Sequence, residues 1–150
     1  MKRTWWLLAV LLLLACATAL AEEPQVIPQL VSARFVYVTT YDGPPWSWSS
    51  VMLSEDRQAV GDVEDALRTW GKYIVVYRPE VADIILVVQK RPTEDILAVY
   101  EARQVYHGKQ VASSIPLWRG MMVGGLASKE LPLVTSFRKA VETAETQNQR

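Results

Sequence analysis

Residues 84–88, Ile-Ile-Leu-Val-Val, form an apolar run without a single polar position. A short run of this kind, rich in β-branched residues, is typical of a strand that is buried on both faces of a sheet. Residues 78–83 before it contain a proline and predict a turn or a single helical turn, and residues 90–95 after it predict a charged turn. The sequence therefore predicts an inner strand over 84–88, around which the rest of the fold is arranged.

The segment nearer the start of the chain predicts a second inner strand followed by a loop. Residues 33–41 are dense in β-branched and aromatic residues, and they place apolar side chains on both faces of the strand. Residues 42–50 contain two consecutive prolines, which remove hydrogen-bond donors that a strand would need. We therefore expect the strand to end at about residue 41.

A helix over residues 54–70 is the clearest element of the sequence. Ser54 supplies a cap at its start, and Gly71 is a stop signal directly after its end. Its apolar residues recur at helical spacing and are Val60, Val63, Leu67 and Trp70. A strand over 73–77 follows, so this part of the chain predicts a β-α-β unit with a right-handed parallel crossover.

The segment beyond residue 95 predicts two more strands and a closing helix. Strands are expected over 96–102 and 115–123, with the tip of a hairpin at 107–109 between them. The final helix is expected over about 133–145, because apolar residues gather on one of its sides. The connections between the later strands are too short for a helix, so these strands are expected to run antiparallel.

Together these elements predict a single mixed α/β (α+β) domain in the order βαββββα, with about five strands in a mixed sheet and two main helices. The domain is expected over residues 33–146, after an extended arm at 22–32 and before a frayed tail at 147–150. Inner strands that are apolar on both faces need cover on both sides, which two helices cannot fully supply. The rest of the cover would come from the final long segment or from a partner molecule.

The first twenty-one residues have the three parts of a secretory signal peptide. Lys2 and Arg3 form a positive start, residues 5–14 are an unbroken apolar run, and Ala19-Leu20-Ala21 offers small residues at a cleavage site. The apolar run is too short for a permanent membrane span. We therefore expect an exported protein, released into the periplasm or the extracellular space after cleavage behind Ala21.

Cys16 leaves a second route open. Leu13-Leu14-Ala15-Cys16 resembles a lipobox, whose cysteine becomes diacylated and holds the protein on a membrane of the envelope. The sequence favours release of a soluble protein over this anchor, because Leu14 is bulky for the motif. Membrane contact is thus expected only through the leader or through a lipid on Cys16.

Removal of 21 of the 150 residues would leave 129, which is the length of one ordinary domain. Cys16 is the only cysteine, so no disulfide is expected. Lys2 and Arg3 would leave with the leader, and the remaining 14 basic and 16 acidic residues give a formal charge of −2. This balance argues against nucleic acid or an anionic membrane surface as a partner.

The later half of the chain resembles a group of exported bacterial α/β domains. Ala82-Asp83, the apolar strand 84–88 and Leu117-Trp118-Arg119-Gly120, followed by a closing helix, carry the resemblance. The group includes uncharacterised lipoprotein families of unknown function and, more distantly, the amino-terminal domain of TolB and the CsgG-like domains. The resemblance implies an envelope domain that binds or assembles rather than catalyses. Residues 113–116 depart from the usual turn of the group, and no functional residues are carried over.

The sequence contains only weak candidates for catalytic residues. His107 is the only histidine and lies on the expected hairpin tip, where it is either a solvated turn residue or a general base acting with Ser113 or Ser114. One histidine and one cysteine predict no metal site, and no cofactor is predicted. Glu94 and Asp95 are adjacent at a strand start and should point to opposite faces. Residues 124–129 lack the spacing of a phosphate-binding loop and predict a hinge into the last helix.

The loop around the two prolines predicts a contact surface. Tyr41, Trp46 and Trp48 gather on it, and rigid aromatic residues make good contact surfaces for proteins, peptides or sugars. The alternative is that these side chains fold back onto the edge of the core. Trp70 and Trp118, in contrast, are predicted to be plain core residues.

The sequence therefore favours a non-enzymatic binding or assembly domain of the cell envelope, whose partner is a protein or an envelope polymer. A homo-oligomer that buries a spare face of the sheet against its own copy is also consistent with the pattern. The alternative function is that of a small periplasmic hydrolase or transferase with a site near His107 or Glu94.

Overall fold

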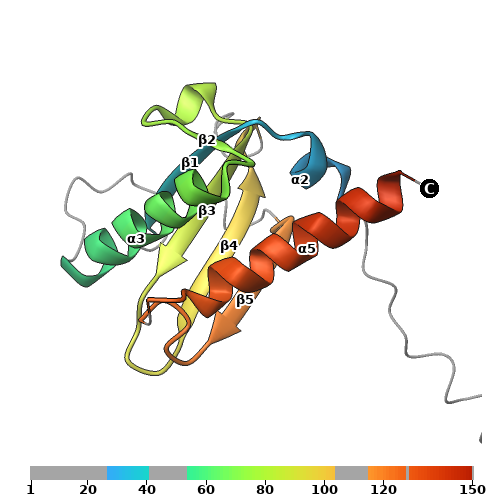
Figure 1. Ribbon diagram of the computed structural model, residues 1–150. Helices are drawn as coiled ribbons and strands as arrows, with labels where there is room; N and C mark the ends of the chain where they lie inside the picture. The colour runs from blue at the N-terminus through green and yellow to red at the C-terminus, as the bar shows by residue number, and fades with distance from the viewer. Residues whose placement is uncertain (1–26, 41–53, 104–114, 128, 150) are drawn as a thin grey trace, which may run out of the picture.

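The computed structural model describes residues 27–40, 54–103, 115–127 and 129–149. They form a five-stranded mixed sheet with three helices on one face, so the predicted mixed α/β fold is confirmed (Figure 1). The strands are β1 (Phe35–Thr40), β2 (Ile74–Val75), β3 (Ile84–Gln89), β4 (Asp95–Glu101) and β5 (Trp118–Met122). The helices are α2 (Pro28–Ser32), α3 (Ser54–Trp70) and α5 (Pro132–Asn148), and a single 3-10 turn, η1, spans Pro79–Val81.

The strand order across the sheet is β2-β1-β3-β4-β5. β1 pairs in parallel with both β2 and β3, which confirms the parallel pairing of the β1-α3-β2 unit. β3-β4 and β4-β5 are antiparallel, as the short connections predicted. The sheet is therefore parallel at one end and antiparallel at the other.

The step from β2 to β3 differs from the prediction, because these strands are not antiparallel neighbours. Val75 and Ile84 both align with Val36, one on each side of β1. β2 has only two residues, so the chain leaves the sheet at once and η1 carries it past the start of β1. The backbone N–H of Asp83 then donates to the carbonyl oxygen of Phe35 at 2.9 Å, which sets the start of β3.

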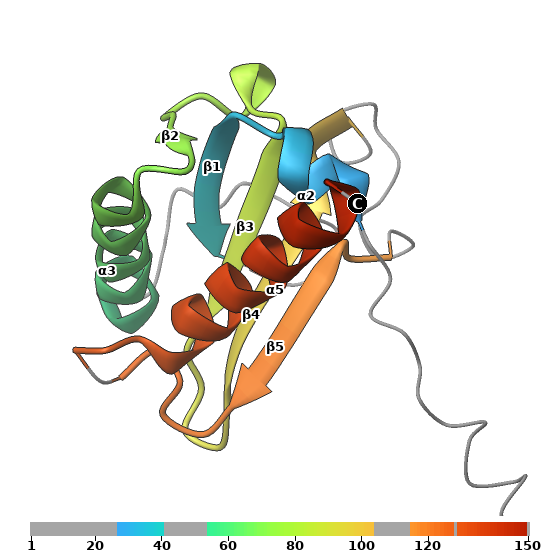
Figure 2. The ribbon, with the colours of Figure 1, turned by 45° about the vertical axis from the view of Figure 1, so that its right-hand side comes forward.

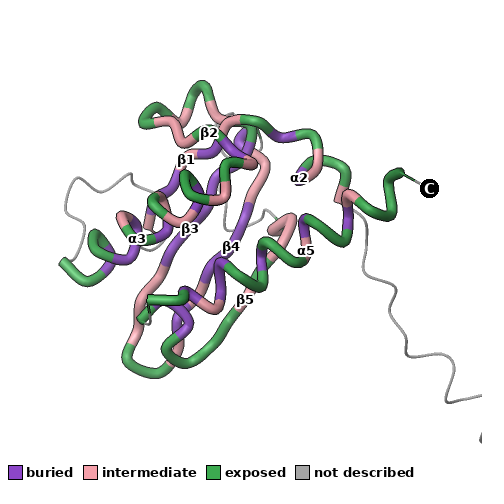
Figure 3. Tube along the Cα trace, in the orientation of Figure 1, coloured by how far each residue is buried: buried purple, intermediate pink, exposed green. Residues whose placement is uncertain are grey.

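The three helices share one face of the sheet but cover different strands of it. α3 packs over β1, β2 and β3, whereas α5 packs over β4 and β5 and contacts α2 (Figure 2). The main core lies between this helical layer and the sheet. Figure 3 shows the buried positions concentrated in the inner strands and on the inner sides of the helices.

The strand 84–88 is buried on both faces, as its apolar run predicted. None of its five side chains is more than 4% exposed. Ile84, Leu86 and Val88 belong to the core under the helices, and Ile85 and Val87 form a smaller cluster with Ala102 on the opposite face. β3 lies in the middle of the sheet because only an inner strand can bury the apolar side chains on both of its faces.

The ends of the described domain correct two predictions. Pro28–Ser32 is a short helix rather than an extended arm, since a proline is well suited to the first turn and Leu30 is only 2% exposed. α5 continues to Asn148, so residues 147 and 148 are helical and do not belong to the frayed tail predicted for 147–150. The two helices α2 and α5 are in contact with each other.

A cleft between α3 and α5

A cleft of about 690 Å³ lies between α3 and α5. Its volume is in the range of sites that take up small molecules or short polymer segments. α3 contributes Gln58, Asp62, Asp65, Ala66, Thr69 and Trp70. The opposite wall consists of α5 and the segment before it, with Ala127, Lys129, Glu130, Leu131, Val134, Thr135 and Arg138.

The floor of the cleft is apolar and is continuous with the core. Trp70 lies at the end of α3, with its ring edge-to-face with Tyr73 at 5.3 Å and with Phe137 at 6.0 Å. Leu131 and Val134 add aliphatic surface from the α5 side. Trp70 is therefore not the plain core residue that the sequence predicted, because it is half-buried and lines the cleft as well as supporting it.

One face of the Trp70 ring is covered by a cation. The guanidinium carbon of Arg138 lies 5.7 Å from the ring centroid, within the range of a cation–π contact. Arg138 also donates to Glu142 at 2.7 Å, one turn further along α5. This pair holds the guanidinium over the indole and makes that side of the floor polar.

The rim carries charges of both signs. Asp62, Lys129 and Glu130 are exposed, and none of them forms an ion pair with another residue in the described part of the chain. Asp65, in contrast, forms an ion pair with Arg68. The cleft thus has an apolar floor and a rim whose free charges are available to a bound molecule.

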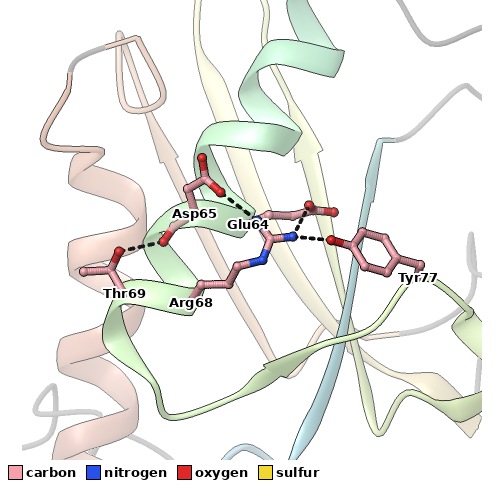
Figure 4. A network of polar contacts seen from close by, with 5 residues as sticks. All are labelled: Glu64, Asp65, Arg68, Thr69 and Tyr77. Atoms are coloured by element: carbon pink, nitrogen blue, oxygen red, sulfur yellow. Dashed lines mark hydrogen bonds and ion pairs between the residues drawn. The ribbon is translucent and has the colours of Figure 1, made fainter.

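A polar network fixes the outer side of the α3 wall (Figure 4). Arg68 donates to Asp65 at 2.6 Å, to Glu64 at 2.8 Å and to the hydroxyl of Tyr77 at 2.7 Å. The hydrogen bond to Glu64 is the main reason that the pKa of Arg68 is raised. Because Tyr77 follows β2, the network ties α3 to the chain beyond it and holds the carboxylate of Asp65 at the edge of the cleft.

The segment before α5 is shaped by two glycines and a buried carboxylate. Gly124 has a φ of +68°, which favours glycine. A Cβ atom at Gly125 would lie 2.6 Å from Cγ of Leu133, so only glycine allows this close approach. Asp95, 2% exposed, accepts the backbone N–H of Leu126 at 2.8 Å. These contacts place Lys129 and Glu130 at the rim.

The sequence-predicted site residues have different outcomes. Tyr41, Trp46, Trp48, His107 and Cys16 lie outside the residues that the structure describes. Asp95, one of the two adjacent acids near the alternative site, is buried and is occupied by the hydrogen bond to Leu126. Its carboxylate therefore has a structural role.

Sequence reasoning missed the cleft because its walls come from distant segments. In the sequence alone, Asp62 and Asp65 are typical of the solvated face of a helix, and residues 124–129 predict only a hinge. A usable signal was Trp70, an aromatic residue at the end of an otherwise aliphatic stripe and directly before Gly71. An aromatic residue at the end of a helix can be only partly covered by the layer beneath it.

Among residues 27–40, 54–103, 115–127 and 129–149, no three potential ligands converge as a metal site would require. Within the same ranges, no helix combines the length and apolar character needed to cross a bilayer. Comparisons with protein-family models, with curated proteins and with solved structures found no match for the chain.

Proposed function

We propose that the chain is an exported cell-envelope domain that acts by binding rather than by catalysis, and that the cleft between α3 and α5 is its contact site for a partner protein. The observation that carries this proposal is the combination of an apolar floor at Trp70 with rim charges of both signs that form no ion pair within the described ranges. Protein interfaces typically have an apolar centre and a polar rim.

A protein segment fits this cleft better than an envelope polysaccharide. Sugars stack on a free aromatic face, but Arg138 covers a face of the Trp70 ring at 5.7 Å. A polypeptide supplies both an apolar side chain for the floor and charged groups for the rim. Asp62 on α3 would attract a cationic group, and Lys129 on the opposite wall an anionic one.

Charge reversals at the rim test the proposal. The tagged full-length chain is isolated from the cells that make it, and every co-isolated protein is quantified by mass spectrometry. Asp62→Lys and Lys129→Glu should each lower the recovery of the same partner about tenfold or more, as rim charges act on association. Glu55→Lys is the matched control, because Glu55 is an exposed acid on α3 that does not line the cleft.

The recovery of each co-isolated protein is compared across the three variants. A protein that is lost from both cleft variants and kept by Glu55→Lys supports the proposal. If every co-isolated protein is recovered equally with all three variants, the cleft is not the contact site. The melting temperature of each variant is measured beside the wild type, so that loss of the fold is not mistaken for loss of binding.

The aromatic loop remains a second predicted contact surface. Trp46→Ala combined with Trp48→Ala is expected to abolish binding of the partner while the melting temperature stays close to that of the wild type. A sharp fall in the melting temperature would instead assign these residues, together with Tyr41, to the core.

Export is supported by the signal-peptide pattern of the first 21 residues. Mass spectrometry of the mature protein tests it directly. An amino terminus at Glu22 means release as a soluble protein, and a diacylated Cys16 means an envelope lipoprotein whose partners are confined to a membrane surface. An intact Met1 terminus would contradict export by this route.

A further inference from the structure

Among the residues that the structure describes, β5 is an edge strand that pairs on one side only. It lies at one end of the strand order and pairs only with β4, and no strand of the described residues lies beyond it (Figure 2). The opposite edge is β2, which has only two residues. An edge strand presents a row of backbone donors and acceptors to any strand that approaches. β5 therefore offers the longer of the two sites for strand addition.

The side chains along this edge are unusually apolar. Met121, Met122 and Val123 are consecutive and are 50%, 41% and 78% exposed. Soluble proteins usually protect such an edge with charged residues, prolines or bulges. Arg119 is the only charged residue of β5. Met121 and Met122 point to opposite faces of the sheet, so exposed apolar side chains flank this edge on both faces, which indicates a surface that is covered by another molecule.

The strand is complementary to itself. When two copies of β5 pair in antiparallel fashion about a two-fold axis at Gly120, Trp118 lies opposite Met122 of the other copy and Arg119 lies opposite its Met121. A methionine sulfur against an aromatic ring is a favourable contact, and no like charges meet. A two-fold axis at Arg119 would instead place that arginine opposite its own copy, which is unfavourable.

The flank of α5 on the same side of the molecule is also suited to a copy of itself. Val134 and Arg138 face the cleft toward α3, so the opposite flank faces away from α3. That flank carries no charge and consists of Ser136, Ala140, Thr143 and Gln147. The two-fold axis that joins the β5 strands is perpendicular to the sheet, so both copies of α5 lie on the same side of the extended sheet. Their uncharged flanks then approach without repulsion.

We propose that the β5 edge binds a second copy of this chain, so that the two sheets join through antiparallel β5 strands centred on Gly120. The surface is distinct from the cleft, which opens between α3 and α5. The dimer therefore leaves both clefts open, and each copy retains its own contact site.

Opposite charge changes at one residue test the proposal. In the dimer, Met121→Lys places each new lysine opposite Arg119 of the other copy, twice by symmetry, and should raise the Kd of the dimer roughly tenfold. Met121→Glu places a carboxylate there and should lower the Kd. The dimer Kd of the full chain, as isolated from cells, is measured by analytical ultracentrifugation for wild type and each variant.

Val81→Lys is the matched control, since Val81 is similarly exposed at 46% but lies on η1, away from β5. Its Kd should equal that of the wild type. A monomeric wild type up to about 100 µM would overturn the proposal, because specific dimers of this kind form well below that concentration. Shifts in the same direction for Met121→Lys and Met121→Glu would also overturn it.

Discussion

α3 and α5 have the same length of 17 residues and lie on the same face of the sheet, but they are attached in different ways. α5 is held mainly by its buried side chains, above all Phe137, which contacts three aromatic rings. α3 also buries apolar residues, yet both of its ends are tied by polar groups. Asp56 near its start binds the residues after β3, and Arg68 near its end binds Tyr77.

This difference explains how the cleft stays open. The polar attachments of α3 lead away from α5, toward the chain after β2 and after β3. A direct link between the two helical segments is an ion pair between Lys72, just beyond α3, and Glu145 near the end of α5. The charged side chains at the rim, such as Asp62 and Lys129, are therefore not needed to hold the fold together and are available for binding, whereas the apolar floor belongs to the core.

The largest predicted effect is on the α5 side. Phe137→Ala removes a side chain that is fully buried and in contact with Trp70, Tyr73 and Trp118. It should lower the free energy of unfolding by about 3–5 kcal/mol in urea denaturation. Ser136→Ala, at an exposed position of the same helix, should change it little. A loss below about 1 kcal/mol for Phe137→Ala would mean that α5 is not held by burial.

A smaller loss is predicted at the start of α3. Asp56 is 2% exposed, accepts the backbone N–H of Lys90 at 2.9 Å and pairs with Arg91. Asp56→Ala leaves the part-buried N–H of Lys90 without its partner and should lower the free energy of unfolding by about 1–3 kcal/mol. Asp56→Asn keeps an acceptor and should lose less. Equal losses in the two variants would show that the N–H of Lys90 is not held by this side chain.

Tyr73, between the two helices, should give stability a pH dependence. Burial raises the pKa of its hydroxyl, with a further contribution from the charge of Glu145, and the hydroxyl donates to the carbonyl oxygen of Leu30 at 2.8 Å. The native state thus keeps a proton that the unfolded chain releases above about pH 10, so stability falls as the pH rises beyond that value.

Tyr73→Phe isolates this effect. At pH 7 it should lower the free energy of unfolding by about 1 kcal/mol through the lost hydrogen bond. Between pH 9 and about 11, its stability should fall less steeply than that of the wild type, because the titrating group is gone. Parallel pH profiles of the two proteins in thermal denaturation would argue against a buried hydroxyl at this position.

The smallest effect is expected at the other end of α3. Arg68 is exposed to solvent, so its ion pairs with Glu64 and Asp65 are screened by water and salt. Arg68→Gln should destabilise the protein less than Phe137→Ala, Asp56→Ala or Tyr73→Phe, and the difference from wild type should shrink as salt is added. A loss as large as that of Asp56→Ala would contradict the view that the two polar attachments of α3 differ in strength.

Local patterns predicted the parts of the fold that depend on neighbouring residues. The apolar run at 84–88 and the helical spacing of 54–70 each identify an element, because burial on both faces leaves a continuous apolar run and burial of one stripe leaves a helical period. The order of the strands in the sheet is harder to predict from the sequence. β2 is so short that nothing in residues 73–77 reveals that the chain crosses the start of β1 before β3 begins.

The cleft could not be predicted in the same way. Asp62 and Lys129 are 67 positions apart in the chain and line the same cleft only after α3 and α5 have packed on different strands. Taken singly, each of these charged residues is typical of an ordinary solvated surface. The helical segment at 28–32 was missed for a related reason, since five residues form a helix only when Leu30 is buried by the rest of the domain.

The central claim, that the cleft between α3 and α5 is the contact site, is tested most directly by photo-cross-linking in the cells that make the protein. A photoreactive residue is placed at position 62 in one strain and at position 55 in another. Both positions are on α3, but Asp62 lines the cleft and Glu55 does not. The account predicts a discrete protein adduct at position 62 that is absent at position 55 and that weakens in combination with Lys129→Glu. The same adducts at both positions, unaffected by Lys129→Glu, would contradict it.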